Sequence, residues 1–385
     1  MPQRTPGDLI VAVLFAMLLL VPAALALSGR AGFDVAFIEG IEQRKPFVAP
    51  PPSTGALATG GWQRDAEREI GDAFPLRRQL IQGNDRALYL GLHDVSSSRV
   101  IGGREGWLFL GDDERSYLTG SRTLDDAQLA ALANLFRARS DWCRGRGISY
   151  VFVLAPNKST IYPQYLPSGL RRAQPTIADR LLPLLRTRGI AVVDPRDVLL
   201  AASTKSEVYS KGDTHWNDAG AFAAYRATLD AIHGSHVRDA PPPERSTTVV
   251  NESGDLLKLA GIDGLAANPV TRIAFSARAR GTRVPQYSGD PNAGAFDITA
   301  DAIDDPRLPS AVVFGDSFLE RLQPFIAENF HRTVVLRYRR VPGVQFDTTV
   351  VAAERPNVVI QELVERSLVF GNEFTSDVTQ KARPL

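Results

Sequence analysis

The pattern of hydrophobic and polar positions separates one long apolar run from a region of short apolar runs. Residues 9–27 are apolar throughout, and only Pro22 breaks their regularity. About twenty such residues are needed to cross a bilayer as a helix. Residues 1–28 are therefore predicted to be an N-terminal signal anchor, with cleavage after Ala24-Leu25-Ala26 as the alternative. Arg4 on the short leading side predicts that this end is cytoplasmic and that the rest lies outside.

A proline-rich segment follows the predicted anchor. Pro50-Pro51-Pro52 and the small residues after it are typical of an extended chain with few hydrogen bonds. We therefore expect residues 29–61 to form a stalk or linker. The folded domain is predicted over residues 62–372, and a short C-terminal tail over residues 373–385.

Beyond the stalk, amphipathic helices alternate with short apolar strands. Helices are predicted from about residue 123 to 145, over 177–187, from 217 to 232 and over 317–329. Strands are predicted over residues 148–154, 190–193, 311–314, 333–336 and 357–360. Strands separated by helices indicate an α/β fold with a mostly parallel sheet flanked by helices on both faces. Residues 241–305 show weaker periodicity, and we expect long loops near the site there.

Charge and cysteine content exclude several classes of protein. Lysine plus arginine, 44 residues, nearly balances aspartate plus glutamate, 43 residues, which leaves a net charge of +1. No global field would draw this chain to nucleic acid, so we expect no nucleic-acid partner. The single cysteine, Cys143, excludes an internal disulfide and cysteine-rich metal sites. We expect it to be a small buried residue, and we expect no metal and no cofactor.

Histidine is the side chain best suited to moving protons near neutral pH, and the sequence has five. His215 is the candidate base, because Asp213 can project to the same side of an extended segment and orient its imidazole. The alternative is a polar turn in which Asp213 or Asn217 caps the next helix. The remaining histidines show no other catalytic signal or are predicted to be surface or capping residues: His93, His233, His236 and His331.

A second candidate lies where the apolar strand at residues 311–314 turns into a helix. Gly315 permits a tight turn, and Ser317 then lies near a helix N-terminus, whose free N–H groups favour a developing oxyanion. This position suits a nucleophile, although Asp316 or Ser317 could simply cap the helix. A serine at such a turn and an aspartate-histidine pair are the complementary parts of a nucleophile, base and orienter.

Together these residues resemble the SGNH (GDSL-like) hydrolase superfamily, which presents its nucleophile in Gly-Asp-Ser after a strand. Ordinary members place the serine first, whereas here the aspartate-histidine pair precedes it and is separated only by Thr214. That order and spacing are similar to the AlgX/AlgJ family of exopolysaccharide O-acetyltransferases. The similarity covers roughly residues 67–370 and includes segments 74–77, 103–109, 155–158, 161–163, 253–256 and 361–366.

The resemblance implies an O-acetyltransferase that carries an acetyl group on Ser317, with His215 as base and Asp213 as orienter, to hydroxyls of a secreted polysaccharide. It also implies a polytopic membrane-bound O-acyltransferase as acetyl donor, because one helix cannot carry acetyl groups across a bilayer. The domain is then periplasmic and anchored to the inner membrane. Two alternatives stay open: a carbohydrate acetyl-esterase with the same three residues, and a non-catalytic assembly subunit.

Two further residues are predicted to bind substrate. Lys158 follows a strand end and could face the substrate, although most lysines are solvated. Trp216 adjoins His215 and could stack on a sugar ring, although core packing is the commoner fate of tryptophan, as for Trp107. Arg366 also follows a strand and is left outside the candidate catalytic set.

Overall fold

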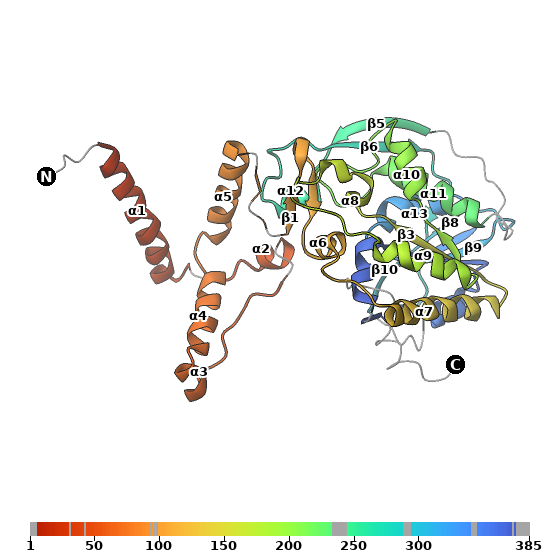
Figure 1. The fold of residues 1–385 in the computed structure, drawn as a ribbon, viewed down its shortest axis with the longest axis horizontal. Helices are drawn as coiled ribbons and strands as arrows, with labels where there is room; N and C mark the ends of the chain where they lie inside the picture. Colours follow the sequence, from red (N-terminus) through yellow and green to blue (C-terminus); the bar gives the residue numbers. More distant parts are fainter. Residues whose placement is uncertain are drawn as a thin grey trace. The chain divides into compact units, whose positions relative to one another are not determined.

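The computed structural model describes residues 6–374 except 31, 42–43, 93, 96, 98, 233–244, 288–293, 340–344 and 372. The chain divides into two compact units, shown in Figure 1: Met1–Ser97 with Lys258–Leu265, and Ser98–Leu257 with Ala266–Leu385. The predicted start of the folded domain at residue 62 differs from this boundary, because residues 62–97 belong to the first unit. His93, His233 and His236 lie outside the described residues.

The regular structure described in the first unit is helical. Its α-helices are α1 (Pro6–Leu25), α2 (Val35–Gly40), α3 (Thr54–Ala58), α4 (Gly61–Asp72) and α5 (Arg77–Leu92). The apolar run lies in α1, where side chains such as Leu14 and Phe15 are exposed. The span Leu9–Gly29 has the length and composition of a membrane-crossing helix, which a signal sequence shares.

The predicted stalk is only partly an extended linker. α3 occupies part of it, and the backbone before α3 is held by carboxylates of α4. The Phe47 N–H donates to Asp72 Oδ2 at 2.9 Å, and the Ala49 N–H donates to Glu69 Oε2 at 3.0 Å. The prediction of a hydrogen-bond-poor segment is wrong here, because acceptors come from a helix that follows in the sequence.

Among the described residues, the second unit is built on a seven-stranded sheet of order β4-β3-β11-β9-β10-β8-β7. Neighbouring strands from β4 to β10 are parallel, and β8 and β7 add antiparallel pairs at one edge. This arrangement confirms the predicted mostly parallel sheet. The strands are β3 (Ser149–Ala155), β4 (Ala191–Val193), β7 (Arg280–Gly281), β8 (Phe296–Ala302), β9 (Ser310–Gly315), β10 (Arg332–Tyr338) and β11 (Val358–Val364).

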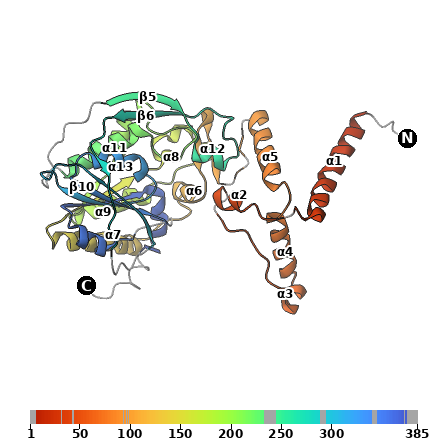
Figure 2. The ribbon, with the colours of Figure 1, turned by 180° about the vertical axis from the view of Figure 1, so that it is seen from behind.

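Helices cover both faces of this sheet (Figure 1 and Figure 2). Side chains of β3 alternate between two cores: Val151 and Val153 point to one, and Tyr150 and Phe152 point to the other. The first core includes helices α11 (Asp218–Ile232) and α13 (Leu319–Ala327), and the second includes α7 (Asp126–Arg144) and α9 (Ile177–Thr187). Cys143, which was predicted to be buried, lies in the second core. Continuous apolar strands are thus explained by burial on both sides.

The region predicted to contain long loops holds regular structure in its described part. β5 (Arg245–Asn251) pairs antiparallel with β6 (Pro269–Phe275), and α12 (Asp255–Leu259) lies between them in sequence. All of β5 is exposed, so its sequence shows no alternation of apolar and polar side chains. Periodicity therefore could not reveal this strand. A shorter antiparallel pair, β1 (Val100–Gly102) with β2 (Leu108–Leu110), opens the second unit.

Candidate active site

Ser317 lies just beyond β9, at the carboxyl end of a central strand of the sheet. The turn before it is fixed by buried Asp316, whose Oδ2 accepts the Val364 N–H at 2.8 Å and whose Oδ1 accepts the Phe318 N–H at 3.0 Å. Asp316 therefore ties the turn to β11 as well as to the start of α13. That helix begins at Leu319, two residues later than predicted.

Glu362 on β11 holds the same turn through a hydrogen bond to its backbone. Its Oε2 accepts the Asp316 N–H at 3.0 Å, and a methyl group at Gly315 would lie 2.5 Å from that oxygen. Burial, together with the nearby charge of Asp316, raises the pKa of Glu362 well above its ordinary value. Glu362 therefore packs against the backbone that presents Ser317, in surroundings that favour its protonated form.

The structure brings Asp213, His215 and Ser317 into one hydrogen-bonded chain. His215 Nδ1 lies 2.8 Å from Asp213 Oδ1, and His215 Nε2 lies 2.8 Å from Ser317 Oγ. With the proton on Nδ1, the imidazole donates to Asp213 and Nε2 accepts the serine hydroxyl proton. The His215 backbone N–H also donates to Asp213 Oδ1 at 2.9 Å, so the aspartate is held by the residue it orients.

The carboxylates beside His215 favour the protonated form of its imidazole. Burial alone would lower the pKa of His215, but the hydrogen bond to Asp213 and the charges of Asp213 and Asp255 raise it above its ordinary value. Burial would raise the pKa of Asp213, but hydrogen bonds and the charge of His215 lower it to about 2. Asp213 therefore stays ionised, which is the state that stabilises an imidazolium.

Lys158 does not lie in a position to contact substrate. It is the first residue of α8 (Lys158–Ile161), and its side chain is buried. Its Nζ donates to the carbonyl oxygens of Ser210, Lys211 and Asp213 at 3.1, 3.0 and 2.6 Å. An ammonium group has three protons, so these bonds use them all. The substrate-binding prediction for Lys158 is wrong, because this side chain instead holds the loop that carries Asp213.

Trp216 is also a structural residue. Its side chain is 1% exposed, and its indole N–H donates to the Phe318 carbonyl oxygen at 3.1 Å. The ring packs edge-on against Phe318 with centroids 5.1 Å apart. The predicted stacking on a sugar is wrong, because the ring is enclosed by the core beneath the residue that follows Ser317. Trp107 is likewise buried and stacks on Tyr165.

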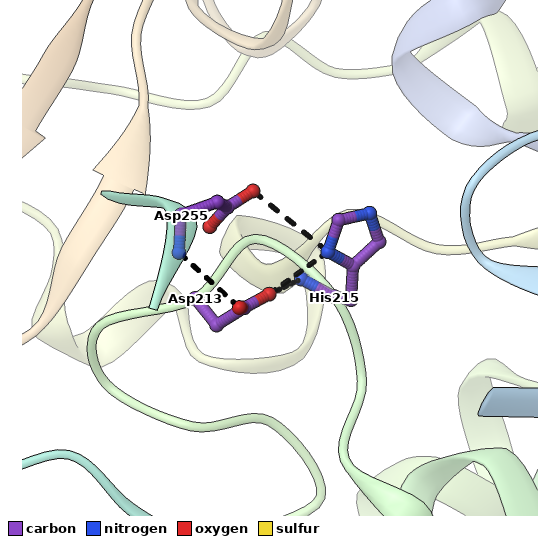
Figure 3. A group of neighbouring side chains, drawn as sticks. All are labelled: Asp213, His215 and Asp255. Carbon is purple, nitrogen blue, oxygen red and sulfur yellow. Dashed lines mark hydrogen bonds and ion pairs between the residues drawn. The ribbon is translucent and has the colours of Figure 1, made fainter. Parts of the chain in front are cut away.

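Asp255 is a charged neighbour that the sequence pattern gave no role. Figure 3 shows its carboxylate beside Asp213 and His215. Its Oδ2 lies 3.7 Å from His215 Nδ1, and its Oδ1 accepts the Thr214 N–H at 2.7 Å. The only sequence signal was its presence in the segment 253–256, which resembles the AlgX/AlgJ family.

The same three side chains are the group in the described part of the chain that could hold a metal ion. One ligand atom from each of Asp213, His215 and Asp255 lies within 4.8 Å of the others. The 2.8 Å hydrogen bond between Nδ1 and Asp213 engages the nitrogen that would face such an ion. We therefore interpret the group as a base with its carboxylate partners.

Arg366 reaches the site from the end of β11. Its guanidinium lies over the Phe318 ring, 5.5 Å from the centroid, and its charge lowers the pKa of His215. Its buried Nη1 has no hydrogen-bond partner among the described residues. Arg366 is thus a positive group near the candidate nucleophile, although the sequence left it outside the set. His331 lies elsewhere, with Nδ1 on the Ile303 carbonyl oxygen.

The mostly parallel sheet and the hydrogen-bonded serine, histidine and aspartate define the class of SGNH hydrolase-like α/β proteins. The family model described as "SGNH hydrolase-like domain, acetyltransferase AlgX" matches residues 100–364. This match covers well over half of the sequence, and the chain belongs to that acetyltransferase family. The reversed order of the Asp-His pair and the serine, noted in the sequence, agrees with this placement.

Individual relatives agree with the family. Two proteins named "Probable alginate O-acetylase AlgJ" are 26% identical to this chain. The one from Pseudomonas putida aligns with 83% of this chain and 83% of its own length, and the one from Pseudomonas aeruginosa with 76% and 71%. The solved structure of Bacillus cereus PatB1 has the same fold, with a TM-score of 0.50, 15% identity and coverage of 69% of this chain and 95% of that one.

Proposed function

We propose that this protein transfers an acetyl group to hydroxyls of a secreted polysaccharide through an acetyl-serine at Ser317. The observation that carries the proposal is the chain of two 2.8 Å contacts from Asp213 through His215 to Ser317. Membership of an acetyltransferase family supports acetyl as the transferred group. The relatives named alginate O-acetylases support a polysaccharide as acceptor.

In the first half-reaction, Ser317 Oγ attacks the acetyl carbonyl while His215 Nε2 takes its proton. The bond from the acetyl carbon to the donor breaks, and the leaving group takes that proton from His215. In the second half-reaction, His215 removes the proton of a sugar hydroxyl, whose oxygen attacks the acetyl carbon of the acetyl-serine. The bond from that carbon to Ser317 Oγ breaks, and Oγ takes the proton from His215, which restores the free serine and the neutral imidazole. The Ser317 backbone N–H would stabilise the oxyanion in both steps.

The acetyl donor would come from the membrane. A single apolar span has no means of moving acetyl groups across a bilayer, so a polytopic membrane-bound O-acyltransferase would supply them. The uncleaved span would anchor the protein in the inner membrane with the second unit in the periplasm. This placement brings Ser317 to the side on which a secreted polymer passes.

The test uses the full chain in detergent with an activated acetyl ester, with and without acetyl-accepting oligosaccharides. We expect the wild type to gain the mass of one acetyl group, to turn over faster with sugar and to release acetylated sugar. Ser317→Ala should lower turnover by about a thousandfold or more and abolish the acetyl adduct. Ser206→Ala, at an exposed serine, should behave as wild type.

The outcomes separate the competing functions. Donor hydrolysis that does not respond to sugar would contradict acetyl transfer and indicate a carbohydrate acetyl-esterase. Polymer acetylation that survives Ser317→Ala in cells, at normal protein level, would contradict the serine mechanism and indicate a non-catalytic assembly subunit. Loss of the product together with loss of the adduct supports the proposal.

A further inference from the structure

We propose that Asp255 is a positioning residue, a second carboxylate that clasps the Asp213-Thr214-His215 segment and shares the positive charge that His215 acquires during the reaction. This inference rests on the proposed function, because it assigns a role in the same proton transfer. Asp255 touches neither Ser317 nor any other atom that would react, and it acts through the residues it holds.

The clasp is formed by two Gly-Asp pairs that lie far apart in the sequence, Gly212-Asp213 and Gly254-Asp255. The Leu256 and Leu257 N–H groups both donate to the Gly212 carbonyl oxygen, at 3.1 and 3.3 Å. This approach requires a bare backbone, because a methyl group at Gly254 would lie 1.9 Å from the same oxygen. The close packing of residue 254 on residue 212 sets Asp255 directly beside Asp213.

Asp255 then makes a contact with each of three consecutive residues. Its backbone N–H donates to Asp213 Oδ2 at 3.3 Å, which engages the aspartate oxygen that His215 leaves free. Its Oδ1 accepts the Thr214 N–H at 2.7 Å, and its Oδ2 lies 3.7 Å from His215 Nδ1. One side chain therefore combines a structural hydrogen bond with a charge that faces the imidazole (Figure 3).

Among the described residues, charged groups from three segments act on this imidazole. Asp213 comes from its own loop, Asp255 from α12, and Arg366 from the end of β11. Lys158 approaches the loop from its carbonyl side, where it bonds to the Asp213 carbonyl oxygen. The aromatic ring of Phe318 lies against the imidazole, with centroids 5.0 Å apart. Asp255 thus adds a negative charge to that of Asp213, and both oppose the positive charge of Arg366 at His215.

The two roles of Asp255 can be separated by substitution. Asp255→Asn keeps an oxygen that can accept the Thr214 N–H but removes the charge, whereas Asp255→Ala removes both. Asp255→Glu restores a charge with one more methylene group. Asp230→Asn is the matched control, because Asp230 is an exposed carboxylate near the end of α11.

The measurement is the pH profile of kcat/KM for the full chain with an activated acetyl ester. His215 must be neutral to take the Ser317 proton, so activity falls as pH drops through the pKa of His215. Both carboxylates raise that pKa. Removing the charge in Asp255→Asn should move the acidic limb to lower pH by roughly half a unit to one unit and lower the plateau about threefold to tenfold.

In Asp255→Ala, the acidic limb of the kcat/KM profile should shift by the same amount, and kcat/KM on the plateau should fall further. In Asp255→Glu, the acidic limb should return towards its wild-type position. Asp230→Asn should change neither. A lower plateau without any shift in Asp255→Asn would overturn the proposal and leave only a structural role, and an unchanged profile would also overturn it. Wild-type turnover that does not depend on Ser317 would instead contradict the proposed function itself.

Discussion

At the scale of single residues, the candidate site includes a buried ammonium group that bonds to the backbone. Lys158 bonds to three carbonyl oxygens in the segment 210–213. Burial lowers its pKa to about 8, opposed by the charges of Asp255 and Asp213. Lys158 therefore fixes the backbone of the candidate orienter, so its contribution should appear in turnover rather than in binding.

Replacing Lys158 tests this role. In Lys158→Met the three carbonyl oxygens lose their donor, and we expect the free energy of unfolding to fall by about 1–3 kcal/mol. We expect kcat to fall about tenfold to a hundredfold, because Asp213 is no longer held in place, while KM stays unchanged. Thermal or urea unfolding and steady-state kinetics measure both effects.

Lys205→Met, at an exposed lysine, provides the control and should match the wild type in both measurements. A raised KM with unchanged kcat in Lys158→Met would contradict the positioning role and indicate that Lys158 binds substrate. The two roles therefore give opposite kinetic signatures.

The candidate catalytic residues could be predicted because chemistry restricts their type and spacing. Asp213 and His215 lie two residues apart, and Ser317 follows a strand, so each left a local pattern. Lys158 and Trp216 were misassigned, because burial is decided by segments far away in sequence and no local pattern reports it. Asp255 went unassigned for the same reason, since it meets His215 only through the tertiary fold.

At the scale of elements, a glycine determines how closely two segments of the site approach. Gly254→Ala would force the segment 254–257 away from Gly212, and we expect a loss of stability of about 1–3 kcal/mol. We also expect a drop in kcat/KM, because Asp255 would withdraw from Asp213 and His215. Thermal unfolding and ester turnover check the two expectations.

Gly281→Ala is the matched control, because a methyl group there meets nothing within 4 Å, and it should change stability by less than about 0.5 kcal/mol. If Gly254→Ala were as stable and as active as the control, the close approach of the two segments would not be needed by the site.

The elements of the sheet show where sequence patterns succeed and fail. Strands β3 and β9 were predicted because both of their faces are buried and their apolar runs are continuous. Of β11, only the apolar start was predicted, because Gln361 and Glu362 interrupt the run although they are buried. β5 was missed because it is wholly exposed, and its pairing with β6 depends on backbone hydrogen bonds that side-chain patterns do not record. Periodicity therefore reports burial, and it finds strands only where burial accompanies them.

At the scale of the whole molecule, the predicted anchor and the candidate site lie in different units. The 21-residue span in the first unit is exposed, whereas the residues of the candidate site all belong to the second unit. We expect intact protein from cells to keep its N-terminal residues and to remain in membranes after an alkaline wash. Leu14→Arg should weaken that retention, because arginine in the middle of a bilayer helix costs roughly 2.5–3.5 kcal/mol.

N-terminal sequencing and fractionation measure these outcomes. Leu57→Arg, at an exposed leucine of α3, is the control and should leave membrane retention unchanged. A soluble protein that begins near residue 27 would show instead that the apolar run is a cleaved signal.

Ser317 and His215 lie 102 positions apart in the sequence, so they come together only when the protein folds. A newly made or unfolded chain carries only an ordinary serine alcohol, with no base within reach. In the proposed mechanism, Ser317 becomes reactive only when β9 has joined the sheet and the loop of Asp213 lies beside it. Under the proposed mechanism, an unfinished chain would therefore not react with acetyl donors.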